Sequence, residues 1–139
     1  MSEILQVYNL PQPDKVLYTY EEAKTRKLFM KWFLAMMKLT FFHAKSVLPQ
    51  KGIVFTHGDT FTTWIAALMG KLAGCKVCHL ESGLRSFNLF EPFPEEIVRI
   101  VTFLLSDVYF CPGDWAVSNL KRFRGKKINT ILNPIYDAV

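Results

Sequence analysis

Short apolar runs alternate with helical patterns along residues 51–139. Each apolar run is bounded by glycine, proline or polar residues, which is typical of a strand buried in a sheet. Between the runs, apolar side chains recur at helical spacing, which predicts amphipathic helices. Because the connections are short and the order is β-α-β-α-β-α-β, the pattern predicts a parallel sheet with helices on its faces. The predicted strands are residues 53–56, 75–80, 107–111 and 128–132.

The helix predicted after Pro94 carries both an apolar stripe and charged residues. Glu95 and Glu96 lie in its first turn, where carboxylates complement the helix dipole. Arg99 follows Glu95 at i, i+4, and on a helical wheel this pair lies opposite the apolar stripe. The stripe, which we expect to face the core, consists of Ile97, Ile100, Val101, Leu104 and Leu105.

Residues 1–50 have a different pattern. They are irregular up to about residue 20, and one long helix is predicted from Glu21 to about Val47. Lysines recur every seventh residue in it and interrupt any apolar run near the roughly 20 residues of a membrane span. We interpret it as a core-covering helix with a solvated lysine face, and a basic helix on an anionic membrane surface is the less favoured alternative. The lysines are Lys24, Lys31, Lys38 and Lys45.

Composition narrows the kind of partner without choosing one. Half of the residues are hydrophobic, so one domain with a real core is expected. Lys and Arg total 17 against 12 Asp and Glu, which favours an anionic partner such as a phosphate, a nucleotide, a nucleic acid or an acidic membrane surface. The first residues show no secretory signal, and 3 cysteines do not favour a disulfide framework, so we expect a cytoplasmic protein.

Cys75, Cys78 and His79 match the Cys-x-x-Cys-His spacing of covalent haem attachment. We reject that interpretation because such attachment needs export, and because strand residues three apart point to opposite faces. A zinc site is not favoured either, since no second pair stands at ligand spacing. The cysteines are interpreted as small apolar fillers, and His79 as structural.

Polar residues gather where the predicted strands end. The segments are 57–60 (His-Gly-Asp-Thr), 81–85 (Glu-Ser-Gly-Leu-Arg) and 111–114 (Cys-Pro-Gly-Asp). The carboxyl ends of parallel strands share one edge of a sheet, where open α/β sheets bind ligands. Helix N-termini at the same edge present free N–H groups to anions. The sequence therefore predicts a site for a phosphate-bearing ligand at this edge.

Structural interpretations of the charged residues remain open at this point. The pair of Glu95 and Arg99 could be a surface salt bridge worth a few tenths of a kcal/mol. Asp59 or Thr60 could be the N-cap of the following helix. Glu81 directly follows a buried strand and needs a partner, and pairing with Arg85 could simply lock the loop.

Together, these segments resemble the UDP-N-acetylglucosamine 2-epimerase family. The matching stretches are 57–62 (His-Gly-Asp-Thr-Phe-Thr), 79–86 (His-Leu-Glu-Ser-Gly-Leu-Arg-Ser) and 92–96 (Pro-Phe-Pro-Glu-Glu) with Arg99. Shorter matches follow at 110–112, 119–120 and 133–138. Order and spacing both fit, from about Ile53 to the last residue.

The resemblance implies a chemistry and assigns residues to it. The family converts UDP-N-acetylglucosamine to its manno epimer through loss of the C2 proton and departure of UDP, and hydrolysing members release N-acetylmannosamine. Such chemistry needs carboxylates with tuned pKa values around one carbon and one oxygen. The implied catalytic residues are Asp59, Glu81, Glu95 and Arg99. The implied substrate-binding residues are His57, Thr60, Arg85 and Ser86.

The chain also departs from the family pattern. Its opening lacks the Gly-Thr-rich turn after a first strand that helps hold the nucleotide sugar. Ser82 stands where many members have alanine, and Val98 stands where many have asparagine, which removes an amide near the site. The second domain of the family, which supplies uridine and diphosphate contacts, has no counterpart here.

These observations predict an α/β fold class: a Rossmann-like parallel sheet with flanking helices, forming an incomplete half of a two-domain glycosyltransferase-B-like fold. Residues 1–139 are expected to form one partial domain, with an irregular start and basic helix over 1–50 and the core over 51–139.

The expected partner is a UDP-sugar, with no metal or other cofactor and no nucleic acid. A second domain on another chain or a homo-oligomer is expected to complete the site, and the isolated chain to be inactive. The alternative is a non-catalytic remnant or subunit that binds a partner chain or a nucleotide, because the exposed flank of an incomplete sheet favours association.

Overall fold

A computed structural model describes residues 9, 11–17 and 25–131 of this chain. The chain divides into two compact units, Met1–Met36 and Met37–Val139. The division of the sequence at residue 50 stays a prediction. Helix α2 runs from Arg26 to Val47, so it begins later than expected, and residues 21–24 lie outside the described part.

The lysines of α2 are exposed wherever the structure describes them, at Lys31, Lys38 and Lys45, as a solvated face requires. Lys24 lies outside the described residues. Over the described ranges, no helix combines the length and the apolar character needed to cross a membrane.

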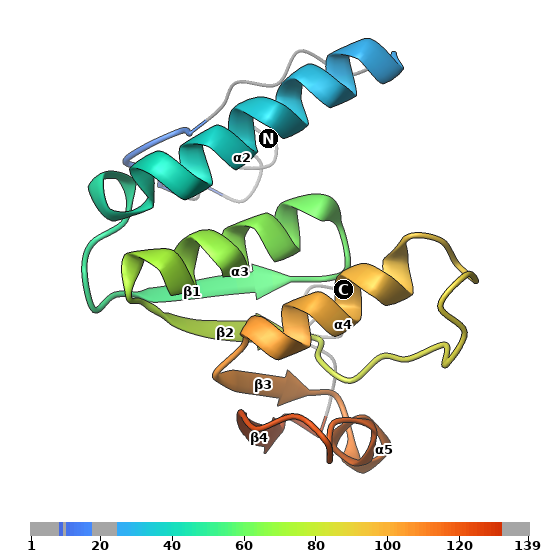
Figure 1. The fold of residues 1–139 in the computed structure, drawn as a ribbon. Coiled ribbons are helices and arrows are strands. Elements are labelled where there is room, and N and C mark those ends of the chain that lie inside the picture. Colours follow the sequence, from blue (N-terminus) through green and yellow to red (C-terminus); the bar gives the residue numbers. More distant parts are fainter. Residues whose placement is uncertain (1–8, 10, 18–24, 132–139) are drawn as a thin grey trace. The chain divides into compact units, whose positions relative to one another are not determined.

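Among the described residues, four strands form one parallel sheet in the order β1-β2-β3-β4 (Figure 1). The predicted α/β fold class and element order are confirmed. The strands are β1 (Ile53–His57), β2 (Lys76–Leu80), β3 (Val108–Cys111) and β4 (Lys126–Asn129), and the helices between them are α3 (Phe61–Ala73), α4 (Glu95–Leu105) and α5 (Asp114–Asn119). The last strand begins two residues earlier than predicted and also ends earlier.

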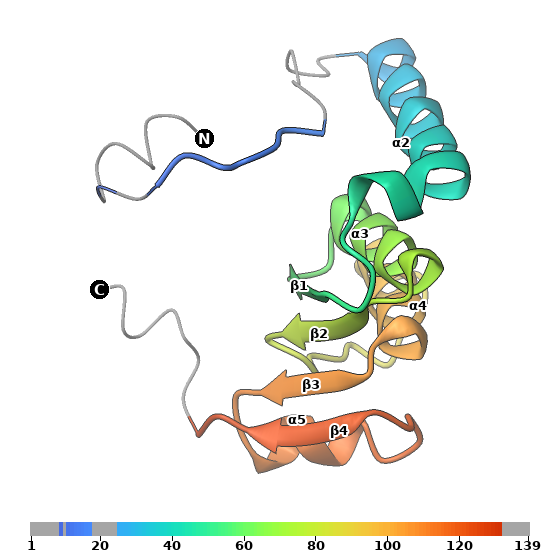
Figure 2. The same ribbon diagram turned by 90° about the vertical axis from the view of Figure 1, so that its left-hand side faces the viewer.

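Helices α3 and α4 lie side by side over one face of the sheet (Figures 1 and 2). Close packing of α3 depends on Gly70, because a Cβ there would stand 3.0 Å from Val54 Cγ2 and 3.1 Å from Val77 Cγ2. Val54 and Val77 are register partners on β1 and β2, so one glycine seats the helix against both strands.

Strand β1 is buried on one face only, which corrects the prediction of a buried strand. Ile53 and Phe55 are each 61% exposed, whereas Thr56 is buried. Alternate residues of a strand point to opposite faces. In the part of the chain that the structure describes, β1 is one of the two edge strands of the sheet, so its apolar composition does not by itself mean burial on both sides.

Helix α4 turns a different face inward from the one that its apolar pattern predicted. Its buried residues are Glu96, Val98, Thr102 and Phe103, while Leu104 is 71% exposed. The ring of Phe103 lies 5.6 Å from that of His79 on β2. The sheet therefore contacts a mixed polar and apolar face of α4, and the predicted stripe was wrong about which side meets the core.

The core beneath α4 and α5 consists of Phe103, Tyr109, Cys111, Ala116 and Leu120. The Tyr109 hydroxyl donates a hydrogen bond of 2.6 Å to the Phe103 carbonyl oxygen, so its polar end is satisfied inside the core. Burial raises the pKa of the Cys111 thiol to about 11.

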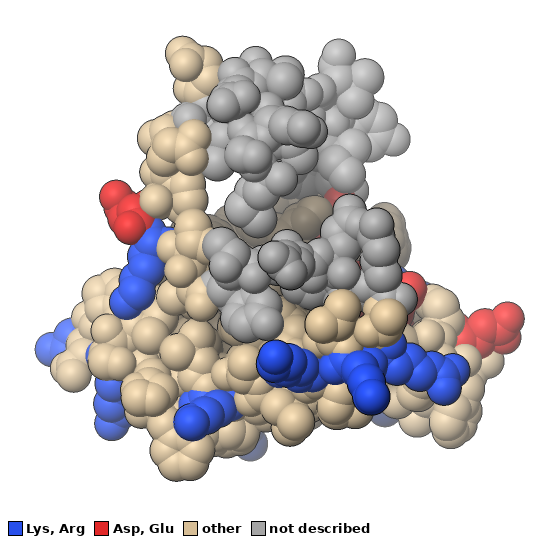
Figure 3. Space-filling view, turned by 90° about the horizontal axis from the view of Figure 1, so that it is seen from above, with Lys and Arg blue, Asp and Glu red and all other residues tan. Residues whose placement is uncertain are grey.

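All three cysteines are buried and unpaired. Small, inert thiols of this kind agree with their interpretation as apolar fillers. On the outside, Lys and Arg side chains are spread across the face in Figure 3, as the excess of basic residues leads one to expect.

Candidate functional site

The carboxyl ends of β1, β2 and β3 lie at one edge of the sheet, and the loops that follow them carry the predicted site. We call this edge the rim, comprising residues 57–60, 81–86 and 111–114. His57 is the register partner of Leu80, so the residues after both strands start from the same level. Glu81 then adopts a left-handed conformation with φ +53°, which is uncommon for a residue with a side chain.

Glu81 and His57 form the first polar pair of the rim. Glu81 Oε2 lies 2.9 Å from His57 Nε2, and the side chains are 11% and 55% exposed respectively. The carboxylate therefore meets a partner at the rim and does not enter the hydrophobic interior. The loop-locking alternative paired Glu81 with Arg85. In the structure, Glu81 contacts His57 and Arg85 forms its ion pair with Glu96.

His79 ties the first two loops of the rim together. Its Nε2 lies 3.0 Å from the Gly58 carbonyl oxygen, and its Nδ1 lies 2.8 Å from Ser82 Oγ. Burial lowers the pKa of His79, with smaller opposing contributions led by the Gly58 hydrogen bond. The neutral ring donates from Nε2 to the Gly58 carbonyl oxygen, and its Nδ1 faces the Ser82 hydroxyl, which also lies within 3.0 Å of the His79 carbonyl oxygen as a donor. The structural interpretation of His79 is confirmed.

Arg99 gathers carboxylates from two separate segments. It forms an ion pair with Asp59, which lies 40 positions away in the sequence. Glu95 Oε2 lies 3.7 Å from the same guanidinium. The Arg99 side chain is only 15% exposed and pairs with two carboxylates, so the interpretation of Glu95 and Arg99 as a simple surface salt bridge does not describe it. The residue that caps α3 is Thr60, without a side-chain cap hydrogen bond, and the N-cap interpretation of Asp59 was wrong.

Glu96 is the residue of this site that sequence reasoning missed. Its side chain is fully buried and accepts hydrogen bonds from Arg85 Nε and from the Ser86 backbone N–H, the latter at 3.1 Å. Arg99 also forms an ion pair with Glu96, in which NH1 lies 3.6 Å from Glu96 Oε2, the oxygen that accepts from Ser86. The i, i+3 spacing to Arg99 was a usable signal, but the position of Glu96 in the first helical turn suggested only a dipole effect.

Burial alone would raise the pKa of Glu96. The hydrogen bonds from Arg85 and Ser86 and the charges of Arg85 and Arg99 outweigh this effect, so the pKa is lowered. Glu96 is therefore a buried carboxylate held in its charged form.

The remaining predicted residues also lie at the rim. Thr60 Oγ1 lies 3.1 Å from Thr63 Oγ1, and Thr63 in turn donates to the His57 carbonyl oxygen at 2.8 Å. The Ser86 hydroxyl donates to the Asn88 carbonyl oxygen at 3.1 Å. Both hydroxyls therefore stabilise the loops that carry the charged groups.

The third loop of the rim contributes differently from the first two. Asp114 accepts a hydrogen bond of 2.7 Å from Asn129, which ties it to β4. Asn119, at the end of α5, donates to the Gly83 carbonyl oxygen at 2.9 Å. Gly83 has φ +92°, and a Cβ there would collide with the backbone of Ala116. Helix α5, which follows the third loop, thus supports the Glu81 loop through Ala116 and Asn119.

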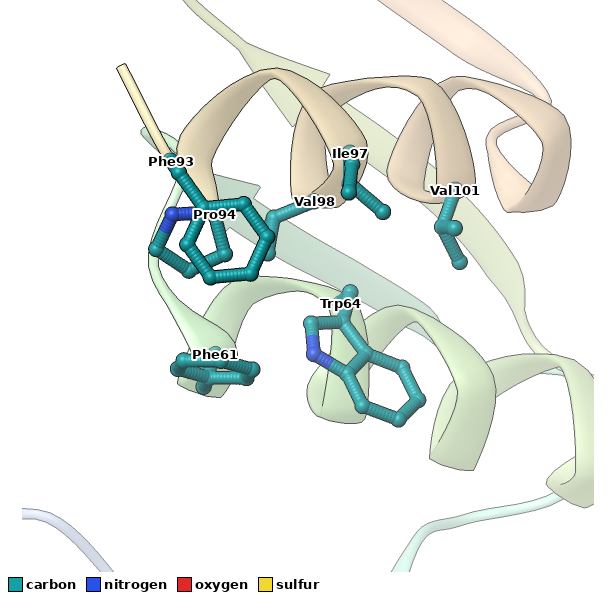
Figure 4. Close-up of a pocket in the computed structure, with 7 residues that line it drawn as sticks. All are labelled: Phe61, Trp64, Phe93, Pro94, Ile97, Val98 and Val101. Carbon is teal, nitrogen blue, oxygen red and sulfur yellow. The ribbon is translucent and has the colours of Figure 1, made fainter. Parts of the chain in front are cut away.

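An apolar pocket of about 330 Å³ lies between α3 and α4, next to the charged groups but not among them. The predicted catalytic residues do not line it, and Val98, expected near the site, does. Its lining is Phe61, Trp64, Phe93, Pro94, Ile97, Val98 and Val101 (Figure 4). Within the described ranges, no three His, Cys, Asp or Glu side chains are grouped to hold a metal ion.

A parallel sheet with charged side chains collected where its strands end is typical of α/β ligand-binding domains. The sequence profile of the UDP-N-acetylglucosamine 2-epimerase family matches residues 4–139. The chain belongs to this family, and the resemblance inferred from the motifs is confirmed.

Two curated relatives illustrate the match. The UDP-N-acetylglucosamine 2-epimerase of Bacillus subtilis is 32% identical over 142 residues, covering 100% of this chain and 36% of the relative. The UDP-2,3-diacetamido-2,3-dideoxy-D-glucuronate 2-epimerase of Pseudomonas aeruginosa is 46% identical over 68 residues, covering 49% of this chain and 19% of that protein.

Solved structures agree with the sequence comparison. The Neisseria meningitidis UDP-GlcNAc 2-epimerase bound to UDP-GlcNAc superposes with a TM-score of 0.74 at 28% identity, covering 93% of this chain and 34% of that one. The Methanocaldococcus jannaschii enzyme gives 0.66 at 31% identity over 86% of this chain and 31% of its own. The chain thus spans about a third of the length of these relatives.

Proposed function

We propose that this chain forms part of an enzyme that interconverts UDP-N-acetylglucosamine and its manno epimer. One observation carries the proposal: Asp59 and Glu95 meet on Arg99 at the same rim that carries Glu81. The chemistry of the family needs several carboxylates around one sugar carbon, and these three come from three different segments.

In the proposed reaction, a carboxylate takes the proton from sugar C2 while the bond between C1 and the UDP oxygen breaks. A proton then adds to the opposite face of C2 while the bond between C1 and the UDP oxygen re-forms with its original configuration, or water adds at C1 in place of UDP and N-acetylmannosamine is released. Asp59, Glu81 and Glu95 are the candidates for the base and for the acid that protonates the departing oxygen. Arg99 orients Asp59 and Glu95 and supplies positive charge beside the departing diphosphate.

The substrate-binding role proposed for His57, Thr60, Arg85 and Ser86 follows from their place at the rim. Arg85 supplies a second guanidinium, and its carbon Cζ lies 4.9 Å from the centre of the Phe87 ring. The substrate class is a UDP-linked 2-acetamido sugar, since relatives that act on different sugars of this class share the matched region.

We also propose that a second domain completes the cleft, carried by another chain or by another copy. Support comes from coverage, because the match covers only 36% of the length of the Bacillus subtilis relative. On this proposal the isolated chain binds the nucleotide sugar weakly and does not turn it over. We further propose that it acts in the cytoplasm.

The proposal is tested by deuterium exchange at C2 of UDP-N-acetylglucosamine in D2O. The chain is combined with the C-terminal part of the Bacillus subtilis relative, and exchange is followed by NMR. Asp59→Asn, Glu81→Gln and Glu95→Gln are each expected to slow exchange about 100-fold or more, the usual loss for an acid–base group. Glu91→Gln, at an exposed residue of the same loop, is the matched control.

An unchanged rate in Glu81→Gln would remove that residue from the mechanism. Exchange by the chain alone would instead overturn the need for a second domain.

A second candidate function is partner binding without catalysis. The exposed apolar residues Ile53 and Phe55 on edge strand β1 favour it. In the same experiment this alternative predicts complex formation without any exchange at C2.

A further inference from the structure

A single buried carboxylate, that of Glu96, contacts Arg85 and Arg99 and is linked through Arg99 to Asp59. Glu96 is fully buried, and it faces Arg85, the Ser86 backbone N–H and Arg99. These partners were assigned to catalysis or to substrate binding from the motifs, whereas Glu96 was not. The residue therefore lies behind the proposed site and is in contact with three of its members.

The partners of Glu96 come from two different elements. Arg85 and Ser86 belong to the loop after β2, and Arg99 belongs to α4, one turn beyond Glu96 itself. A carboxylate accepts hydrogen bonds in defined directions at both oxygens. Here one oxygen binds Arg85 Nε and the other faces both the Ser86 N–H and Arg99. The carboxylate thus fixes the loop relative to the helix.

The connection continues from Arg99 to the loop after β1. The same guanidinium that contacts Glu96 through NH1 contacts Asp59 and Glu95 through NH2. A guanidinium is planar, so fixing one of its nitrogens fixes the plane in which the other donates. The orientation of Arg99 toward Asp59 accordingly depends on Glu96.

A buried ion pair is not in itself evidence for stability, since apolar residues of similar volume often replace one without loss. A shared carboxylate among groups at a ligand-binding edge is better explained by orientation. Four charged side chains, Asp59, Arg85, Glu96 and Arg99, are held in one network beneath the rim.

We propose that Glu96 is the positioning residue of this site, which orients Arg85 and Arg99 for a nucleotide sugar and does not touch the sugar itself. This inference rests on the proposed function and deepens it. Replacement of Glu96 is expected to change the orientation of both guanidinium groups without removing any side chain that is proposed to meet the substrate.

The test uses the 139-residue chain, uniformly ¹⁵N-labelled, with Glu96→Gln as the main variant and Glu96→Asp as a variant that keeps the charge. Glu91→Gln is the matched control. The Nε–Hε signals of Arg85 and Arg99 report the network, and titration with UDP-N-acetylglucosamine reports binding.

In a folded Glu96→Gln variant, both arginine signals are expected to shift and the Arg85 Nε–H to exchange with solvent about tenfold faster, the factor that one charge-assisted hydrogen bond supplies. Binding is expected to weaken by a similar factor, and Glu96→Asp is expected to recover part of it. If Glu96→Gln does not fold, the Arg signals of Glu96→Asp decide, and are expected to be displaced in the same direction by a smaller amount.

Unchanged arginine signals in folded Glu96→Gln would overturn the proposal. If the glutamine variant does not fold, unchanged signals in folded Glu96→Asp would do the same. An equal loss of binding in Glu91→Gln would also overturn it. If the unaltered chain shows no binding of UDP-N-acetylglucosamine, the proposed function fails in this chain. The arginine signals still decide whether Glu96 positions the guanidinium groups.

Discussion

Single residues at the rim are held by hydrogen bonds that connect neighbouring strands. His79 bridges the Gly58 carbonyl and the Ser82 hydroxyl, so its neutral ring lies between the loops that carry Asp59 and Glu81. Sequence reasoning identified His79 as structural from its place inside a strand. It did not identify its partners, because a carbonyl 21 positions away leaves no trace in the local pattern.

The buried His79 predicts a dependence of stability on pH. Its pKa is lowered in the folded state, so the unfolded chain binds more protons as the pH falls. The contribution of His79 to stability is complete above the unfolded pKa of about 6.5 and is lost as the pH falls toward the lower folded value. Urea unfolding at pH 7.5 and pH 5.5 (about 1 unit on either side) measures it.

His79→Gln is expected to flatten this part of the pH dependence. His43→Gln, at an exposed residue of α2, is the control and should leave it in place. Equal slopes in the unaltered chain and in His79→Gln would contradict the assignment.

Gly83 predicts a difference between two glycine substitutions. Gly83 and Gly74 both have a positive φ, but only Gly83 lies against a backbone, that of Ala116. Gly74→Ala should cost about 1–2 kcal/mol for the left-handed conformation alone. Gly83→Ala should cost more, about 3 kcal/mol or above, because the backbone must also move. Denaturant unfolding of both variants compares them, and equal costs would show that the contact with Ala116 relaxes freely.

The sequence predicted which helices and strands form better than it predicted which of their faces are buried. The order of strands and helices followed from apolar spacing, because each period of the pattern corresponds to one local geometry. The side that each element buries did not follow, as Ile97 on α4 and Phe55 on β1 show. A helix that touches both a sheet and another helix has two contact faces, and spacing alone does not say which neighbour an apolar stripe meets.

Asp107 is expected to fix the junction of α4 and β3. Its Oδ2 accepts from the Val77 backbone N–H at 2.8 Å, and its Oδ1 pairs with Lys71 at 2.7 Å. Asp107→Ala should cost about 1–3 kcal/mol, because the Val77 N–H loses its partner. Lys71→Ala should cost less than about 1 kcal/mol, since that pair is well exposed. Thermal unfolding of both variants tests this order, and a larger cost for Lys71→Ala would reverse the assignment.

The whole molecule combines a predictable framework with a site that was predicted in part. Asp59, Glu95 and Arg99 were inferred from the motif resemblance, and the structure brings them together. Glu96 was missed because burial of a carboxylate depends on partners from a distant loop. The second domain is an expectation that comes from the family resemblance and not from the pattern of apolar and polar residues in this chain.

The exposed face of β1 predicts self-association of the isolated chain. Ile53 and Phe55 expose apolar surface at the sheet edge, which favours pairing with another chain. Phe55→Lys is expected to lower the association constant about tenfold or more, since roughly 1.5–3 kcal/mol accompanies burial of such a side chain. Sedimentation velocity measures it, and Phe42→Lys, at an exposed residue of α2, is the control. An equal effect in both variants would show that general surface hydrophobicity is responsible.

The hydrogen bond from Asn119 to the Gly83 carbonyl has one more consequence. The position of the backbone at Gly83, two residues after Glu81, depends on Asn119, the last residue of α5. Asn119 is not among the residues proposed to take part in the reaction. Asn119→Ala should therefore shift the loop that carries Glu81 without removing any of the proposed acidic residues, which the backbone amide NMR signals of residues 81–84 would report.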